Sequence, residues 1–79
     1  MSTTPLQLAA DRLVELGRRR DHLEAHTAYL ARDIAALAAS GQTMNVTFEA
    51  RVIDYRNARD ELAEVRREYA ALLGIPSSH

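Results

Sequence analysis

The sequence predicts an all-α protein, an antiparallel two-helix hairpin over about residues 5–39 and 45–73. Three observations support this prediction. Four leucines recur at strict seven-residue spacing between residues 16 and 37, the pattern of one continuous apolar helical seam. A glycine-containing break follows at residues 40–43, and a second stripe with the same spacing then runs from 48 to 69. A short link between two long helices places them side by side in opposite directions.

The first helix has a clear start signal. The Thr4 hydroxyl can accept a hydrogen bond from a free backbone N–H of the first turn. Pro5 follows at the first helical position, where a missing N–H costs nothing. Gln7 then completes the spacing of a capping box. These residues predict that the helix begins at about residue 5.

Glycine marks the ends of both predicted helices. Gly41 can adopt the left-handed conformation that closes the first helix. Thr43 and Asn45 are both suitable N-caps for the second helix, and the sequence does not decide between them. Gly74, followed by an apolar residue and a proline, is typical of a Schellman ending. The second helix is therefore expected to end at about residue 73.

One glycine lies inside the first predicted helix. Gly17 costs about 1 kcal/mol relative to alanine in a helix interior, and Asp21 with Glu24 could cap a new start. A kink or break near Gly17 is therefore an alternative, but the leucine spacing runs through it and favours one continuous helix. We expect a single domain, residues 1–79, with frayed ends at 1–4 and 76–79.

Each predicted helix carries an apolar face wider than one neighbouring helix can cover. A chain of 79 residues without a disulfide or a metal is also near the lower size limit for a self-sufficient core. We therefore expect a homodimeric four-helix bundle, with a monomer that binds a helical segment of another protein as the alternative. The residues expected in the core or interface are Leu13, Leu16, Leu23, Leu30, Ile34, Leu37, Phe48, Tyr55, Leu62, Val65, Tyr69 and Leu72.

Five arginines come to one level of the predicted hairpin when the chain is folded about Gln42. They are the candidate binding residues Arg18, Arg19, Arg20, Arg66 and Arg67. Such a cluster could bind phosphate, because guanidinium forks match phosphate geometry. A solvated, salt-bridged surface is the favoured interpretation, because glutamates lie at the same level and Glu64 is expected opposite Arg20. These glutamates are Glu15, Glu61, Glu64 and Glu68.

His22 and His26 are four residues apart and therefore share one face of the first helix. Such a pair can hold zinc or nickel if a third ligand is supplied. The residues expected at that level of the second helix, near Ala58 and Leu62, offer no carboxylate. We therefore interpret the two histidines as polar neighbours of the leucine seam, with metal binding as an alternative.

Composition excludes several functional classes. Ten arginines and no lysine stand against 11 acidic residues, so a net charge of -1 gives no general attraction to nucleic acid or anionic membranes. The lack of cysteine excludes disulfide scaffolds, thiolate metal sites and thiol catalysis. There is no glycine-rich phosphate loop and no acidic pair inside the apolar stripes, so we expect no enzymatic activity and no cofactor.

The apolar runs are far shorter than the ~20 residues of a membrane span, which favours a cytoplasmic protein without membrane contact. Exclusive use of arginine together with abundant alanine is typical of a high-GC genome, such as that of an actinobacterium or its phage. The leucine spacing resembles that of a leucine zipper, but the continuous basic region of a bZIP protein does not precede it.

The sequence therefore predicts a non-enzymatic protein–protein interaction module. Such a module could be a small adaptor, an assembly chaperone, or an inhibitor or regulator of a partner protein. The expected partners are a second copy of the chain and another protein. The first alternative is a nucleic-acid-binding hairpin dimer that uses the arginine level, and the second is a metal-binding protein that uses His22 and His26.

Overall fold

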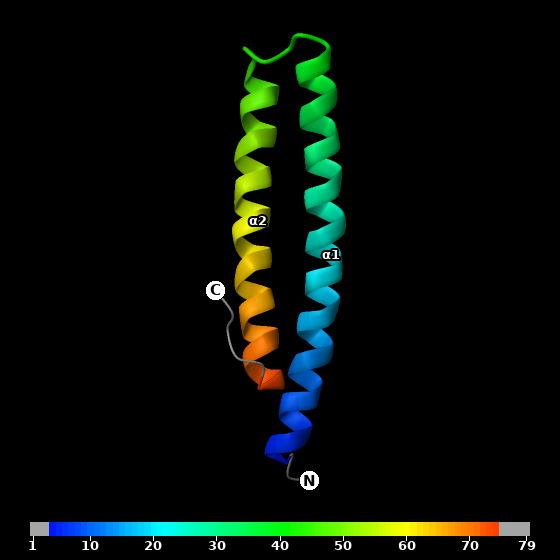
Figure 1. Ribbon diagram of the computed structural model, residues 1–79, viewed down its shortest axis with the longest axis vertical. Helices are drawn as coiled ribbons and strands as arrows, with labels where there is room; N and C mark the ends of the chain where they lie inside the picture. Colours follow the sequence, from blue (N-terminus) through cyan, green and yellow to red (C-terminus); the bar gives the residue numbers. More distant parts are fainter. Residues whose placement is uncertain (1–3, 75–79) are drawn as a thin grey trace.

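The computed structural model describes residues 4–74 and contains two helices within them. Helix α1 spans Pro5–Ala39 and helix α2 spans Val46–Leu73, and they pack side by side as an antiparallel hairpin (Figure 1). The described residues contain no strand. The all-α hairpin predicted from the sequence is therefore confirmed. Helix α1 also runs through Gly17 without a break, as the leucine spacing indicated.

The helix ends are formed by the residues that the sequence marked. The Thr4 hydroxyl accepts a hydrogen bond from the Gln7 N–H at 3.1 Å. At the start of α2, the Asn45 side chain accepts from the Phe48 N–H at 2.8 Å, which makes Asn45 and not Thr43 the N-cap. The glycines that follow α1 and α2 both have the left-handed backbone, with φ of 79° and 75°. Of the frayed ends expected at 1–4 and 76–79, all but Thr4 lie outside the described residues, and Thr4 is the N-cap of α1.

The core is a single narrow line between the two helices. Its buried members are Leu16, Leu23, Leu30, Ala58, Leu62 and Val65. Tyr55 and Tyr69 pack against this line from α2 and remain half-buried. No polar side chain of the described residues is buried. The leucine seam of α1 thus packs on the second apolar stripe, as the heptad spacing predicted.

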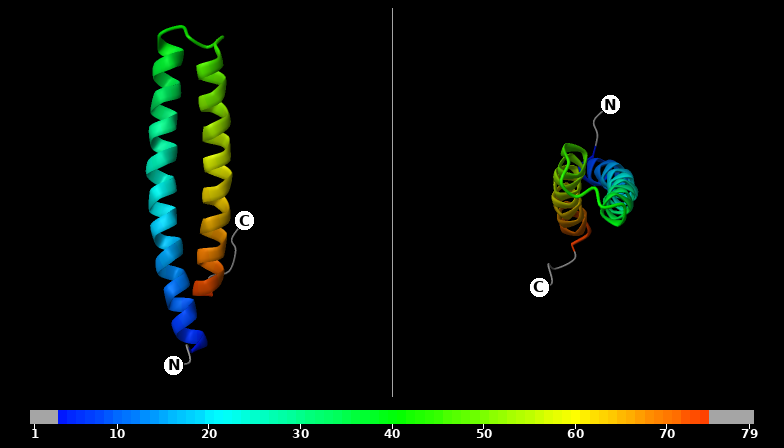
Figure 2. Two further views of the ribbon diagram at one scale, coloured as in Figure 1. Left: turned by 180° about the vertical axis from the view of Figure 1, so that it is seen from behind. Right: turned by 90° about the horizontal axis from the view of Figure 1, so that it is seen from above.

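The hairpin is one layer of helix thick. Seen from above, its two helices lie next to each other with nothing stacked on either face (Figure 2). The molecule measures 57 × 32 × 15 Å, and its radius of gyration is 17.1 Å. A compact domain of this length would have a radius of gyration of roughly 12 Å. Because stable domains bury apolar surface between at least two layers, both broad faces of this rod remain open to a partner.

The level of each residue follows from the register of the hairpin. Asp33 and Arg51, which are equally distant in sequence from Gln42, form an ion pair of 2.7 Å between the helices. Residues equally far from Gln42 therefore lie at about the same level, as assumed in the sequence analysis. We call residues 31–53 the loop end, and residues 5–30 with 54–73 the remote half. All six buried side chains belong to the remote half.

Candidate functional site

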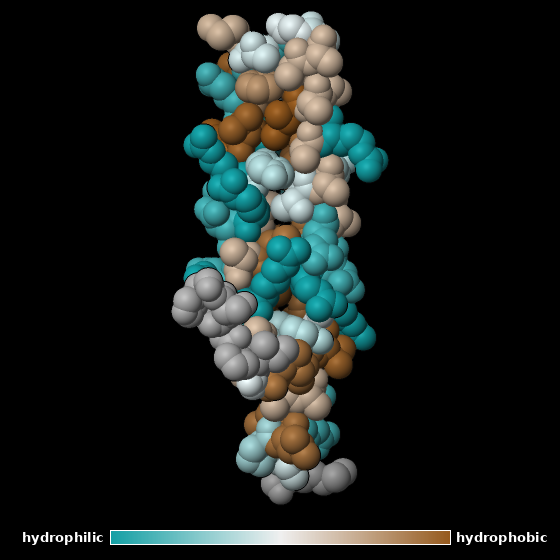
Figure 3. All heavy atoms as spheres, in the orientation of Figure 1, coloured by the Kyte–Doolittle hydropathy of each residue, from teal (hydrophilic) through white to brown (hydrophobic). Residues whose placement is uncertain are grey.

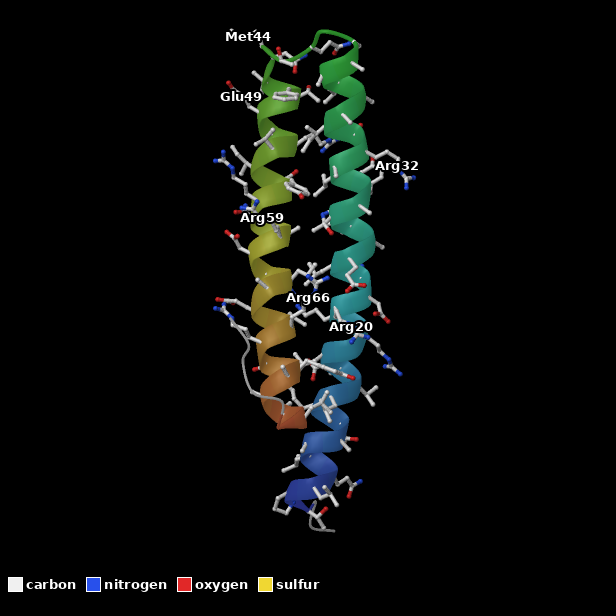
Figure 4. The ribbon with its side chains drawn as sticks, viewed as in Figure 1. Arg20, Arg32, Met44, Glu49, Arg59 and Arg66 are labelled. Atoms are coloured by element: carbon white, nitrogen blue, oxygen red, sulfur yellow. The ribbon has the colours of Figure 1, made fainter. Side chains whose placement is uncertain are left out.

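Two of the five arginines at the predicted level form ion pairs with the opposite helix. Arg19 donates to a Glu61 carboxylate oxygen across the hairpin, so one of the four glutamates expected at this level does pair with the cluster from the other helix. On the other face, Arg66 reaches from α2 toward α1 (Figure 4) and donates to the Glu24 carboxylate at 3.0 Å. Glu24 was not assigned to this level from the sequence. These two pairs connect the helices on both sides of the leucine seam.

The other arginines of the level have local partners. Arg20 lies 3.2 Å from the Asp21 carboxylate, and its guanidinium is 5.0 Å from the centre of the Tyr69 ring. The hydrogen bond with Asp21 raises the pKa of Arg20. Glu64, which was expected opposite Arg20, instead lies 4.0 Å from Arg67 on its own helix. Stacking on the tyrosine ring thus replaces the expected cross-helix ion pair.

Arg12 is a member of this ionic network that the sequence analysis did not single out. It lies 2.7 Å from Glu68 of α2 and 3.1 Å from Glu15 of its own helix. The hydrogen bond to Glu68, together with the charge of that carboxylate, raises the pKa of Arg12. Its position seven residues before Arg19 is the signal that could have found it. Alternating charges therefore continue along one edge of the remote half.

Arg18 is the member of the cluster without an ion pair in residues 4–74, since no carboxylate oxygen there lies within 4 Å of it. The remaining four candidate arginines each have a carboxylate neighbour. A surface with such mixed charges has little net potential for a polyanion. The geometry therefore favours the salt-bridged interpretation of the arginine level.

The two histidines lie parallel on the surface of α1. The ring centres of His22 and His26 are 6.0 Å apart and the ring planes differ by 7°. They border an open groove of about 360 Å³ that Asp54 and Glu61 of α2 also line, two carboxylates that the register had not placed there. Glu61 is paired with Arg19. Within residues 4–74, no three potential metal-ligating side chains lie close enough to share an ion.

A patch of large apolar side chains at the loop end is only partly covered. We call it the loop-end patch. It consists of Ile34, Leu37, Phe48, Val52 and Ile53. None of these five is buried, and Ile53 is 55% exposed. Leu37 continues the line of Leu30, which is 1% exposed, yet Leu37 remains half-buried. Burial along the leucine row of α1 therefore decreases within two turns of the loop.

The loop-end patch opens on one broad face of the rod. Ile34 follows Arg20 by two heptads, and Val52 precedes Arg66 by the same interval, so both lie on the face that carries the Glu24–Arg66 ion pair. Phe48, Val52 and Ile53 line a shallow hollow of about 370 Å³. Figure 3, which views this face, shows apolar side chains gathered next to the loop, hydrophilic ones below them, and apolar ones again toward the opposite end of the rod.

The two sides of this patch differ in size. On α2 it is formed by the large side chains Phe48, Val52 and Ile53. On α1, apart from Ile34, the neighbouring positions of the same face are exposed alanines. These alanines are Ala31, Ala35 and Ala38. The sequence analysis assigned Ile34, Leu37 and Phe48 to a core or interface but missed Val52 and Ile53, which lie outside its two apolar rows.

Comparison of the chain with protein-family models, with curated proteins and with solved structures found no match. Neither α1 nor α2, as described, combines the length and the apolar character needed to cross a membrane. The described residues thus combine ion pairs along the remote half, exposed apolar side chains at the open end of the rod, and a partly covered apolar patch at the loop end.

Proposed function

We propose that this chain is a non-enzymatic protein–protein interaction module that binds through its loop-end patch. Adaptors, assembly chaperones and inhibitors of partner proteins all act through such surfaces. The observation that carries the proposal is the lack of burial at the loop end. Five large apolar side chains gather there, and the hairpin covers none of them fully. Contiguous apolar surface on a small protein marks a place where another protein binds.

The single layer of helices supports the same proposal, because within residues 4–74 no further element covers either broad face of α1 and α2. The ionic network weighs against the nucleic-acid alternative, because four of the five candidate arginines already have carboxylate neighbours.

A capture experiment with two matched variants tests the proposal. Ala35 and Ala36 are adjacent, exposed residues of α1, but Ala35 lies beside the loop-end patch and Ala36 points about 100° away from it. A tagged chain is used to recover binding proteins, including untagged copies of itself, from its native host. We expect Ala35→Asp to lose what the wild-type chain recovers and Ala36→Asp to retain it. Equal recovery by both variants would contradict a role for the patch.

A further inference from the structure

The face that carries the loop-end patch is suited to a second copy of the same chain. An isologous dimer places the same surface of both copies in contact, so that surface must be complementary to itself. A two-fold axis parallel to the rod would place α1 of one copy on α2 of the other at the same level. Self-complementarity can then be examined by comparing the α1 side of this face with its α2 side.

The shapes of the two sides match. Val52 of α2 is level with residue 32 of α1, and Phe48 is level with residue 36, because the members of each pair are equally far from Gln42. In the dimer, Val52 and Phe48 of one copy would therefore lie beside the exposed alanines of the other copy, Ala31, Ala35 and Ala38. Alternation of large and small residues across an interface lets facing helices interdigitate. The two-fold axis makes this contact between α1 of one copy and α2 of the other occur twice in the dimer.

The charges match as well. Farther from the loop, the α1 side of this face carries Asp21 and Glu24 together with Arg20, a net charge of -1, while the α2 side carries Arg59 and Arg66. The same two-fold axis would bring the acidic side of one copy over the basic side of the other. An antiparallel arrangement of the copies would instead cover charges such as Arg66 with apolar side chains, which strips their hydration without a compensating partner.

We propose that the loop-end patch is covered by a second copy of the chain in a two-fold dimer whose loops lie at the same end. In this four-helix bundle, α1 of each copy packs on both α2 helices. The inference rests on the proposed function and names the partner at the same patch. It converts the single layer of helices into two layers, with an apolar centre near the loop and an ionic rim away from it.

The first test measures assembly. The wild-type chain is expected to sediment at twice its mass of 8.8 kDa, with a urea midpoint that rises with protein concentration. Ala35→Asp would bury a charge opposite Glu49, and it should raise the dissociation constant at least roughly tenfold. Ala36→Asp should leave that constant unchanged. A wild-type monomer at all concentrations, or equal weakening by the two variants, would overturn the proposal.

The second test fixes the arrangement and does not depend on a destabilising substitution. The chain has no cysteine, so single cysteines can be introduced cleanly. An equimolar mixture of Ala35→Cys and Glu49→Cys should form a mixed disulfide under mild oxidation, because these residues are level on facing helices. The matched mixture of Ala36→Cys and Glu49→Cys should not. The opposite result would show that the copies meet through another face and would overturn the two-fold arrangement.

These experiments separate the dimer from the proposed function. If the wild-type chain is monomeric but Ala35→Asp selectively loses another protein in the capture experiment, the interaction module stands and the second copy is excluded. If Ala35→Asp abolishes the dimer and no other protein is ever recovered, the second copy is the occupant of the patch. If neither variant changes assembly or capture, both proposals fail.

Discussion

The remote half and the loop end of this hairpin share one heptad spacing but are held together in different ways. In the remote half, all six buried side chains lie between the helices. Three ion pairs join the helices there, through Arg12, Arg19 and Arg66. At the loop end, a single pair between Arg51 and Asp33 joins the helices. The large apolar residues of that end remain half-buried or exposed.

This difference shows that heptad spacing sets which side chains point toward the neighbouring helix but does not guarantee their burial. Leu30 and Leu37 occupy the same row, yet only Leu30 is fully covered. A two-helix contact buries one line of residues, and wider apolar faces need a third or fourth helix. The remote half uses charged residues to border its core, whereas the loop end has apolar residues there.

The largest expected effect sharpens the comparison within the α1 seam. Leu30→Ala should lower the free energy of unfolding by about 2–5 kcal/mol, the range for an emptied leucine site in a packed core. Leu37→Ala should cost less in a monomeric background such as Ala35→Asp, because Leu37 is only partly buried whereas Leu30 is 1% exposed. Urea denaturation at fixed protein concentration measures both. A cost below about 0.5 kcal/mol for Leu30→Ala would refute the assigned seam.

Two glycines, one in each region, should respond in opposite directions to alanine. Gly41 at the loop end has a φ of 79°, so Gly41→Ala should lower the free energy of unfolding by about 1 kcal/mol or more. Gly17→Ala should raise it by about 1 kcal/mol through helix propensity. A Cβ there would meet Tyr69 at an ordinary contact distance of 3.9 Å. Thermal unfolding of the two variants measures both changes in stability. Destabilisation by Gly17→Ala would mean that a Cβ at residue 17 has less room beside Tyr69 than the 3.9 Å contact distance indicates.

The helix caps provide the next comparison. Asn45→Ala should cost about 1 kcal/mol, because the Asn45 side chain satisfies the Phe48 N–H at the start of α2. Thr4→Ala should change the global stability less, since the first turns of α1 extend past the end of α2 (Figure 1). Those turns can open without separating the helices. Amide hydrogen exchange should show faster exchange near Gln7 in Thr4→Ala, and equal global losses in both variants would contradict this reasoning.

The sequence was sufficient for the hairpin because local signals agreed with the heptad pattern. Thr4, Gly41 and Gly74 each require a particular backbone geometry, and the structure has that geometry. The sequence could not decide between Thr43 and Asn45, because both side chains can cap a helix. The two choices change the length of the loop by only two residues. Register placed Glu61 near the arginine level, but it did not indicate that Glu61 would pair with Arg19, because Arg19 is level with Val65 and reaches Glu61 one turn away.

Other parts of the candidate site depend on side-chain direction, which spacing does not supply. Arg20 stacks on Tyr69 and pairs with its neighbour Asp21, so Glu64 on the opposite helix is left to Arg67. The loop-end patch includes Val52, which borders a heptad row but belongs to neither row. Its exposure depends on how far apart the helices lie near the loop, and that distance is a tertiary property.

The smallest stability effect concerns the ionic border of the remote half. Arg19→Gln and Glu61→Gln, alone and combined, should give a coupling of roughly 0–1 kcal/mol in a double-mutant cycle, because both side chains are partly exposed and screened. Raising the salt concentration should reduce this coupling further. A coupling well above that range would mean that the pair is shielded from water, as it would be if the second copy covered this face instead of the face with the loop-end patch.

The same arginines also decide between the two main classes of function. If Arg18 and Arg19 contacted a phosphate backbone, affinity for duplex nucleic acid would fall steeply with salt, and each lost contact would lower the log–log slope by about one unit. The carboxylate neighbours of four of the five arginines leave little net positive potential. We therefore expect no measurable binding to generic duplex DNA or RNA at physiological salt, as tested by fluorescence anisotropy. A micromolar complex that Arg18→Gln with Arg19→Gln abolishes would assign the remote half, and not the loop end, as the functional surface.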